Sequence, residues 1–188
     1  MEDKKDLILA MRHYGLCRYQ PEKPFIISPN VQSPWYFDIK SALLLDITRN
    51  IICRMLNHQI NKILDFKPPT LLIGGPANGA YLLTALIYGF PKFFIYHKSI
   101  AGLEISENIE GWKVREGDRV ILIDDIMIAE SLMLSCIKYV EKNGGKLTAI
   151  IPVLDCGCGG LEEYNELIKP LIVENDFALW EGHKYASE

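Results

Sequence analysis

The sequence predicts one α/β domain with a central, mostly parallel sheet flanked by helices. Between residues 70 and 154, short apolar runs typical of buried strands alternate with helix-length segments, a pattern typical of βαβ units. The 188 residues, 49% of them apolar, suffice for one full core and are too few for two large domains. Because ligands bind such sheets at the carboxyl ends of the strands, we expect the chemistry just after Ile73, Ile123 and Leu154.

The individual elements follow from hydrophobic periodicity. Apolar residues at helical spacing predict a helix from Leu7 to Leu16 and a longer one from about Ile47 to Leu64. The polar stretch from Ser99 to Asp118 is expected to be a mobile loop. The predicted strands are Thr70–Ile73, Lys92–Tyr96, Arg119–Ile123 and Lys146–Leu154, and the predicted intervening helices are Tyr81–Tyr88 and Ser131–Lys142.

Composition argues against several classes of partner. A formal charge of -4, with 24 acidic residues against 20 Lys and Arg, argues against nucleic acid, which needs clustered cations. The first residues contain no apolar run that suits a signal peptide or membrane span, so we expect no membrane contact. The odd number of five cysteines favours the reducing cytoplasm. Cys156 and Cys158 lack a second ligand pair for closed zinc coordination, which leaves a Gly-rich turn as the alternative to a metal role.

Two adjacent carboxylates, Asp124 and Asp125, follow the apolar strand that begins at Arg119. Holding two acids together is costly unless a cation or hydroxyl groups face them, such as a ribose diol with hydrated Mg²⁺. The alternative is a solvated turn in which Asp125 lies near a helix N-cap. The pair alone leaves both interpretations open.

The segment around this pair resembles the phosphoribosyl pyrophosphate signature of type I phosphoribosyltransferases, an apolar run followed by DDVITTG. Both acids match, but Ile128, Ala129 and Glu130 stand where that family has Thr, Thr and Gly. In the family, this loop holds the 5′-phosphate with backbone N–H groups at the start of a helix, a favourable place for an anion. The resemblance therefore implies a phosphate loop that has lost hydroxyl donors and gained a repelling carboxylate.

Further segments resemble orotate phosphoribosyltransferases, and together the matches reach from about Tyr14 to Gly160. Residues 25–38, FIISPNVQSPWYFD, are similar to the FxLxSGxxSPYYFD segment of that family, which implies a small hood over the base. Residues 73–80, IGGPANGA, are similar to its pyrophosphate loop. The resemblance also implies a type I phosphoribosyltransferase fold, a small-molecule ligand, a homodimer, and Mg²⁺ where a phosphoribosyl ligand binds.

The departures from that family mostly remove positive charge. Ser28 stands at a family Lys, His97 at an Arg, Ala101 at the loop Lys, and Cys156 at the Arg that grips the orotate carboxylate. Lys98 is retained. No Lys, Arg or His lies between residues 99 and 111. Since each contact to a charged group contributes about 1.5–3 kcal/mol, losing several should slow the reaction by many powers of ten.

The sequence therefore favours an orotate phosphoribosyltransferase-like protein in which transfer of ribose 5-phosphate to orotate is impaired or absent, a ligand-binding or regulatory homologue. The alternatives are an active orotate phosphoribosyltransferase of pyrimidine (UMP) biosynthesis, and a phosphoribosyltransferase for a different, neutral base. The candidate catalytic residues are Asp124, Asp125 and Lys98, with His97 as a further candidate; no side chain is expected to bind a metal directly, and Mg²⁺ would be held through the ligand near the two acids. The candidate ligand-binding residues are Ser33, Tyr36, Phe37, Asp38, Gly75, Ala77, Asn78, Gly79, Ile128, Ala129, Glu130, Ser131, Asp155 and Cys156.

Overall fold

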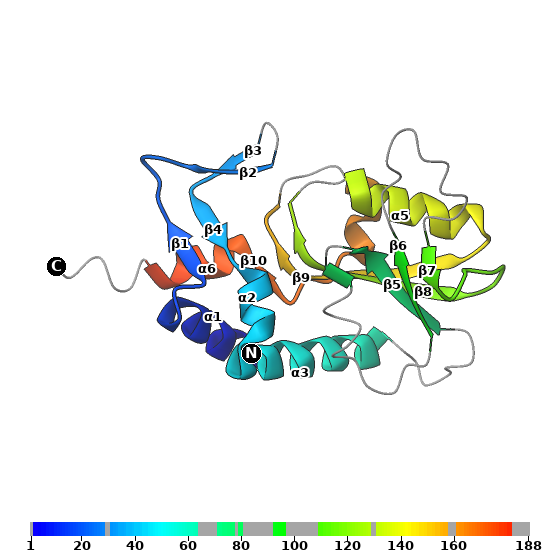
Figure 1. The fold of residues 1–188 in the computed structure, drawn as a ribbon, viewed down its shortest axis with the longest axis horizontal. Coiled ribbons are helices and arrows are strands. Elements are labelled where there is room, and N and C mark those ends of the chain that lie inside the picture. Colours follow the sequence, from blue (N-terminus) through cyan, green and yellow to red (C-terminus); the bar gives the residue numbers. More distant parts are fainter. Residues whose placement is uncertain are drawn as a thin grey trace.

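The computed structural model describes residues 2–28, 31–63, 71–77, 79–80, 92–96, 109–128, 131–157 and 161–181. At its centre lies a six-stranded sheet in the order β10-β9-β8-β5-β6-β7 (Figure 1). All neighbouring strands are parallel except the edge pair β6 and β7, which confirms the predicted fold class. The strands are β5 (Leu71–Pro76), β6 (Phe93–Tyr96), β7 (Ile109–Gly111), β8 (Arg119–Met127), β9 (Lys146–Asp155) and β10 (Ile172–Val173).

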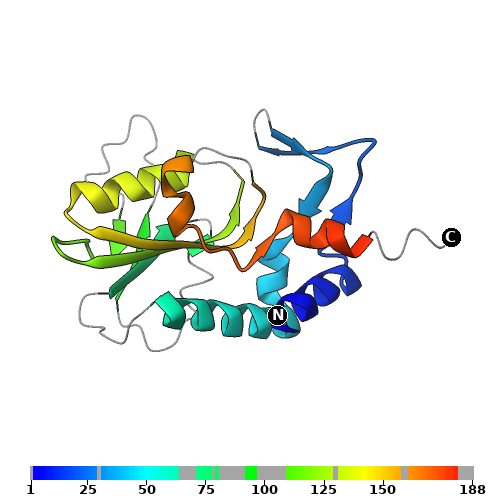
Figure 2. The same ribbon diagram turned by 180° about the vertical axis from the view of Figure 1, so that it is seen from behind.

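Helices cover both faces of this sheet. Helix α3 (Asp46–Ile63) lies along one face and α5 (Ser131–Lys142) along the other, as both ribbon views show (Figures 1 and 2). Successive residues of β8 serve the two faces in turn, because strand side chains alternate. Ile121 packs into the cluster that contains α3 residues, and Leu122 packs into the cluster that contains α5 residues. A short 3₁₀ helix, η1 (Glu162–Leu167), follows β9 in the sequence.

The N-terminal elements form a second, smaller part of the molecule beside the sheet. They are α1 (Glu2–His13), β1 (Cys17–Tyr19), β2 (Phe25–Ser28), β3 (Val31–Ser33), β4 (Trp35–Phe37) and α2 (Ile39–Leu44). Two antiparallel pairs, β1 with β4 and β2 with β3, make the hood that the sequence predicts. The C-terminal helix α6 (Glu174–Glu181) returns to this part and lies beside it in both ribbon views (Figures 1 and 2).

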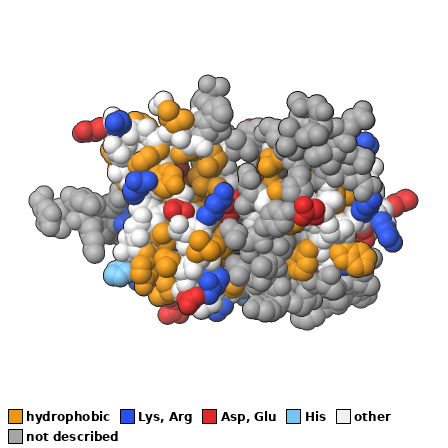
Figure 3. Space-filling view, viewed as in Figure 1, with side chains coloured by type: hydrophobic (Ala, Val, Ile, Leu, Met, Phe, Trp, Pro, Cys, Tyr) orange, Lys and Arg blue, Asp and Glu red, His pale blue; other side chains and the backbone are white. Residues whose placement is uncertain are grey.

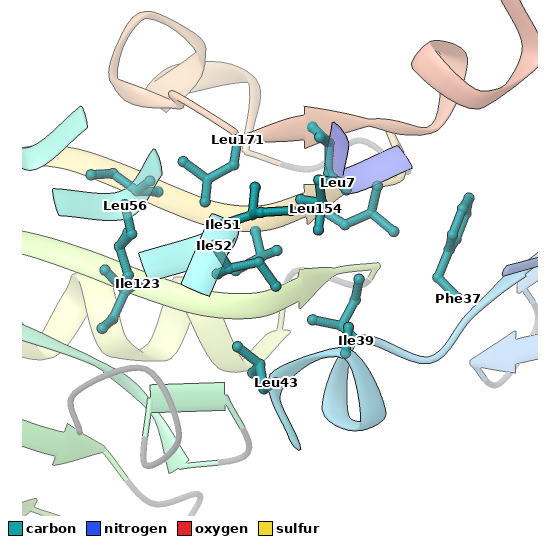
Figure 4. Close-up of a cluster of buried hydrophobic side chains, with 14 of the residues drawn as sticks. Leu7, Phe37, Ile39, Leu43, Ile51, Ile52, Leu56, Ile123, Leu154 and Leu171 are labelled. Atoms are coloured by element: carbon teal, nitrogen blue, oxygen red, sulfur yellow. The ribbon is translucent and has the colours of Figure 1, made fainter. Parts of the chain in front are cut away.

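One hydrophobic cluster joins the hood to the sheet. It includes Leu7 of α1, Ile39 of α2, Ile52 of α3 and Ile123 of β8, and Figure 4 shows these side chains converging between the ribbons. Phe177 of α6 is fully buried in the same cluster. Since these side chains exclude water together, the position of the hood is coupled to the packing of the sheet.

Several predicted boundaries were wrong. The first helix runs over Glu2–His13 rather than Leu7–Leu16, because a turn with Gly15 at φ 66° ends it. Residues 109–111 pair with β6, although we expected a mobile loop there. Strand β8 continues to Met127, so the two acids lie inside the strand and not after it. The predicted helix Tyr81–Tyr88 and the predicted loop over residues 99–108 lie outside the described residues. None of the helices that the model describes is sufficiently long and apolar to cross a membrane.

Candidate functional site

The acidic pair sits in the C-terminal half of β8 and is held by its own backbone. The N–H of Asp125 donates to Asp124 Oδ1, and the N–H of Ile126 donates to Asp125 Oδ1, both at 2.9 Å. Asp125 is only 3% exposed, and Asp124 is partly buried. The two carboxylates are therefore fixed in place before any ligand binds.

The end of β5 and the helical residues that follow it pack directly against strand β8 and its acids. A Cβ atom placed on Gly79 would lie 2.2 Å from Asp124 Oδ1 and 2.3 Å from the backbone nitrogen of Asp125. At Gly75, such an atom would lie 2.0 Å from the carbonyl oxygen of Ile123. Only glycine allows this approach. The structure thus brings the Gly-rich segment and the acidic pair together at the carboxyl ends of β5 and β8.

Electrostatics at the pair favour a protonated carboxyl group. Burial raises the pKa of Asp124 well above its usual value, and the negative charge of Asp125 and a hydrogen bond between the two side chains add to this rise. The positive charge of Lys40, from α2, acts on the Asp124 pKa in the opposite direction. Lys40 was not among our candidates, although its place two residues after Asp38 could have indicated that it lies beside the site.

Two of the hood candidates make local contacts that fix the hood. Both carboxylate oxygens of Asp38 accept hydrogen bonds from Ser41, from its N–H at 3.0 Å and its hydroxyl at 2.8 Å, which caps α2. Ser33 Oγ accepts from the N–H of Trp35 at 3.0 Å and donates to Glu174 at 3.4 Å. Asp38 and Ser33 therefore hold the hood in shape, whether or not they touch a ligand.

A pocket of about 120 Å³ lies between the hood and the ends of β8 and β9. It unites three candidates from separate parts of the sequence, Tyr36, Ile128 and Cys156, and Phe37 lines it as well. We call this the hood pocket. Ile126, which directly follows Asp125, also lines it, so the acidic pair and the hood pocket occupy adjoining positions of β8. The described residues that line it are Ile26, Ile27, Trp35, Tyr36, Phe37, Ile126, Ile128 and Cys156.

Helix α6 is a part of this region that the sequence did not reveal. The ring of Phe177 lies 4.7 Å from the ring of Phe37 and 5.9 Å from that of Trp35, measured between centroids. Arg12 of α1 donates to the Phe177 carbonyl oxygen at 2.7 Å. The tail of the chain thus supports the aromatic wall of the hood pocket. In Figure 3, hydrophobic side chains gather over the half of the surface that the N-terminal elements form.

Other candidates cannot be placed in this geometry. Asp155 is next to Cys156, and its Oδ1 accepts the N–H of Gly157 at 2.8 Å. His97, Lys98, Asn78, Ala129 and Glu130 lie outside the described residues, as do Cys158 and the side chain of Ser131. Ala77 opens the helical segment that leads to Gly79. Within the described ranges, no cluster of three His, Cys, Asp or Glu side chains is arranged to bind a metal ion.

Comparison with known proteins gives this arrangement a family context. The orotate phosphoribosyltransferase of Methanothermobacter thermautotrophicus is 28% identical over 158 residues, which cover 81% of this chain and 83% of that protein. The chain is thus similar to an orotate phosphoribosyltransferase over most of the length of both proteins. No family model matches the sequence.

Solved structures of orotate phosphoribosyltransferases have a similar fold. The orotate phosphoribosyltransferase of Aeropyrum pernix aligns with a TM-score of 0.73 and 17% identity, over 94% of this chain and 98% of that one. The Mycobacterium tuberculosis enzyme in complex with 5-phospho-alpha-D-ribosyl 1-diphosphate aligns with a TM-score of 0.67 and 21% identity, over 94% and 99% of the two chains. The chain therefore has the type I phosphoribosyltransferase fold.

Proposed function

We propose that this protein binds a ribose phosphate at the acidic pair and transfers ribose 5-phosphate to orotate slowly or not at all. The observation that carries the proposal is the contrast between two chain segments. The acidic pair is tightly supported by Gly79, whereas Cys156, which stands at the family's orotate-gripping Arg, lines an apolar pocket. Loss of a guanidinium there removes a charge-assisted, often bidentate contact.

The acidic pair fits a sugar ligand that carries Mg²⁺. Carboxylate oxygens are hard donors that suit hydrated Mg²⁺ and ribose hydroxyls. The carboxylate oxygens of Asp124 and Asp125 can accept hydrogen bonds from both hydroxyls of a diol. The metal would neutralise diphosphate charge, held through the ligand and its waters. Asp124 and Asp125 would orient the sugar, and Lys98 would contact the diphosphate.

The phosphate loop is where binding is expected to be weakest. Glu130 stands at the family's Gly, and a negative charge in a loop that would hold an anionic 5′-phosphate weakens binding by repulsion. Isothermal titration calorimetry with ribose 5-phosphate and Mg²⁺ tests this. We expect the triple variant Ile128→Thr, Ala129→Thr, Glu130→Gly to bind at least tenfold more tightly than the natural sequence. Unchanged affinity would contradict the proposed effect of the loop.

An active orotate phosphoribosyltransferase of pyrimidine biosynthesis is the second candidate. Its support is the 28% identity to a protein of that name over most of both chains. Steady-state transfer to orotate separates the two candidates, because only the active enzyme turns over at ordinary enzyme rates.

We also propose that the chain folds as one domain, forms a homodimer and acts in the cytoplasm. The shared core of hood and sheet supports the single domain. A groove between α1 and α3 exposes Leu9, Tyr14 and Ile47, and covering such a groove with a second copy would bury apolar surface. Sedimentation of the natural chain and of Ile47→Glu tests the dimer. A dimer is expected only for the natural chain, and a monomeric natural chain would contradict it.

A further inference from the structure

The hood pocket differs from an anion site in every side chain that lines it. Five of its eight lining residues have hydrocarbon side chains. The other three, Trp35, Tyr36 and Cys156, contribute an indole, a phenol and a thiol. None of the eight carries a cationic side chain. A carboxylate that entered would lose part of its water shell and meet no positive partner among these eight side chains.

Two of the residues that line the pocket follow acidic residues in the sequence. Asp125 directly precedes the lining residue Ile126, and Asp155 directly precedes Cys156. Backbone pairing fixes this acidic edge, because Cys156 donates its N–H to the carbonyl oxygen of Met127 at 3.1 Å. The sequence neighbours of Ile126 and Cys156 therefore supply no positive charge.

The guanidinium of Arg18, on strand β1 of the hood, is engaged in cation–π contacts with two aromatic rings. The guanidinium of Arg18 lies over the ring of Tyr36, 4.6 Å from its centroid, and 5.4 Å from the centroid of Phe25. Arg18 is not among the lining residues of the pocket. It therefore stabilises the hood by cation–π contact.

We propose that the hood pocket binds an uncharged, planar, one-ring heterocycle and rejects the anionic ring of orotate. The proposal deepens the proposed function and rests on it, since it names the ring that would accompany the ribose phosphate. The aromatic side chains of β4 offer flat apolar surface to such a ring. The volume of about 120 Å³ favours one ring over two.

Three ligands that differ in one substituent test the proposal on the natural protein. Uracil has the ring of orotate without its carboxylate, and the 6-carboxamide of uracil has nearly the shape of orotate without its charge. We expect calorimetry with Mg²⁺ and ribose 5-phosphate present to give uracil a Kd at least tenfold below that of orotate. The carboxamide should bind within about threefold of uracil, because charge and not size excludes orotate.

Substitutions at Cys156 test the same claim by changing the charge of the pocket instead of the ligand. Cys156→Arg restores a cation at the pocket and should lower the orotate Kd at least tenfold, whereas the matched control Cys156→Ser should leave the ratio of uracil to orotate affinity within threefold. Circular dichroism and the unfolding midpoint check that both variants fold. If Cys156→Arg does not fold, the three-ligand series on the natural protein decides alone.

Several outcomes would overturn the inference. Orotate binding as tight as uracil binding would do so, and so would a carboxamide as weak as orotate. Orotate binding that disappears in Arg18→Gln would mean that Arg18 supplies the missing cation. A protein that takes up ribose 5-phosphate but none of the three rings contradicts the inference alone, whereas rapid transfer to orotate contradicts the proposed function as well.

Discussion

The two walls of the candidate site are built by different means. On the sheet side, the main chain defines the surface, since Gly75 and Gly79 bring the end of β5 and the helical residues that follow it against the backbone and acids of β8. On the hood side, side chains such as Tyr36, Ile128 and Cys156 define the surface. A side chain that only lines a space can be exchanged without moving the backbone, whereas a Cβ at Gly79 cannot be accommodated. The side chains of the hood pocket can therefore change while the acidic wall stays in place.

The largest effect is expected from removing the support of the hood wall. Phe177→Ala should reduce the free energy of unfolding by about 3–5 kcal/mol, because a fully buried ring that contacts Trp35 and Phe37 leaves a cavity. Urea unfolding followed by tryptophan fluorescence measures the loss. The control Leu44→Ala removes a side chain that is 70% exposed and should change stability by no more than about 0.5 kcal/mol. Equal effects would show that α6 does not support the hood.

On the sheet side of the site, even one added methyl group should destabilise the fold. Gly79→Ala forces a Cβ into Asp124 and the Asp125 backbone, and such overpacking costs about 1–3 kcal/mol. Gly157→Ala serves as the control, since an added Cβ would meet nothing within 4 Å there and only the φ of 67° is unfavourable, a cost of about 1 kcal/mol. The unfolding midpoints in urea compare the two. A Gly79→Ala protein that is as stable as the natural one would contradict the close approach.

The acidic wall should also give stability a characteristic pH dependence. Because the pKa of Asp124 is raised in the folded state, the folded chain binds more protons than the unfolded chain between the two pKa values. The contribution of Asp124 to stability is therefore fully present below the unfolded pKa of about 4 and is lost as pH rises through the folded pKa. Each unit of difference corresponds to about 1.4 kcal/mol.

Asp124→Asn isolates this contribution. Unfolding free energies of the natural chain should fall between acidic and neutral pH, and the variant should show a smaller fall. Some slope should remain in the variant, because burial also raises the pKa of Glu174. A slope that is the same in both proteins would contradict the assignment to Asp124.

The smallest effect is expected at the surface contact between α1 and α6. Lys4 Nζ lies 2.7 Å from Asp176 Oδ2, and the Lys4 side chain is 38% exposed. Such a pair contributes about 0–1 kcal/mol in solvent, so Lys4→Met should shift the urea midpoint only slightly. The buried Phe177, and not this ion pair, should hold α6 to the hood. A loss as large as that of Phe177→Ala would reverse this ranking.

The sequence predicted those features whose signals are local. Buried strands such as β8 and β9 are continuous apolar runs, and helix α5 has a clear helical period ending at Lys142, so the parallel sheet could be anticipated. The hood strands β1 to β4 have three or four residues each, and pairing rather than propensity forms them. Resemblance to a family, not periodicity, indicated that region.

The features that the sequence did not predict depend on tertiary packing. Phe177 lies in a short tail of mixed composition, and its burial depends on Trp35 and Phe37 far away in the chain. The acids lie within β8 because β9 pairs with it as far as Met127. The role of Lys40 depends on where α2 places it relative to Asp124. Each of these contacts joins segments distant in the sequence, which local patterns cannot report.

The central claim, a retained acidic wall without effective orotate chemistry, is tested most directly by the rate of orotate consumption. The purified protein is assayed at steady state with Mg²⁺ and saturating phosphoribosyl pyrophosphate. The account predicts turnover far below the range of about 1–1,000 per second that is typical of enzymes. Turnover of about one per second or faster would contradict it.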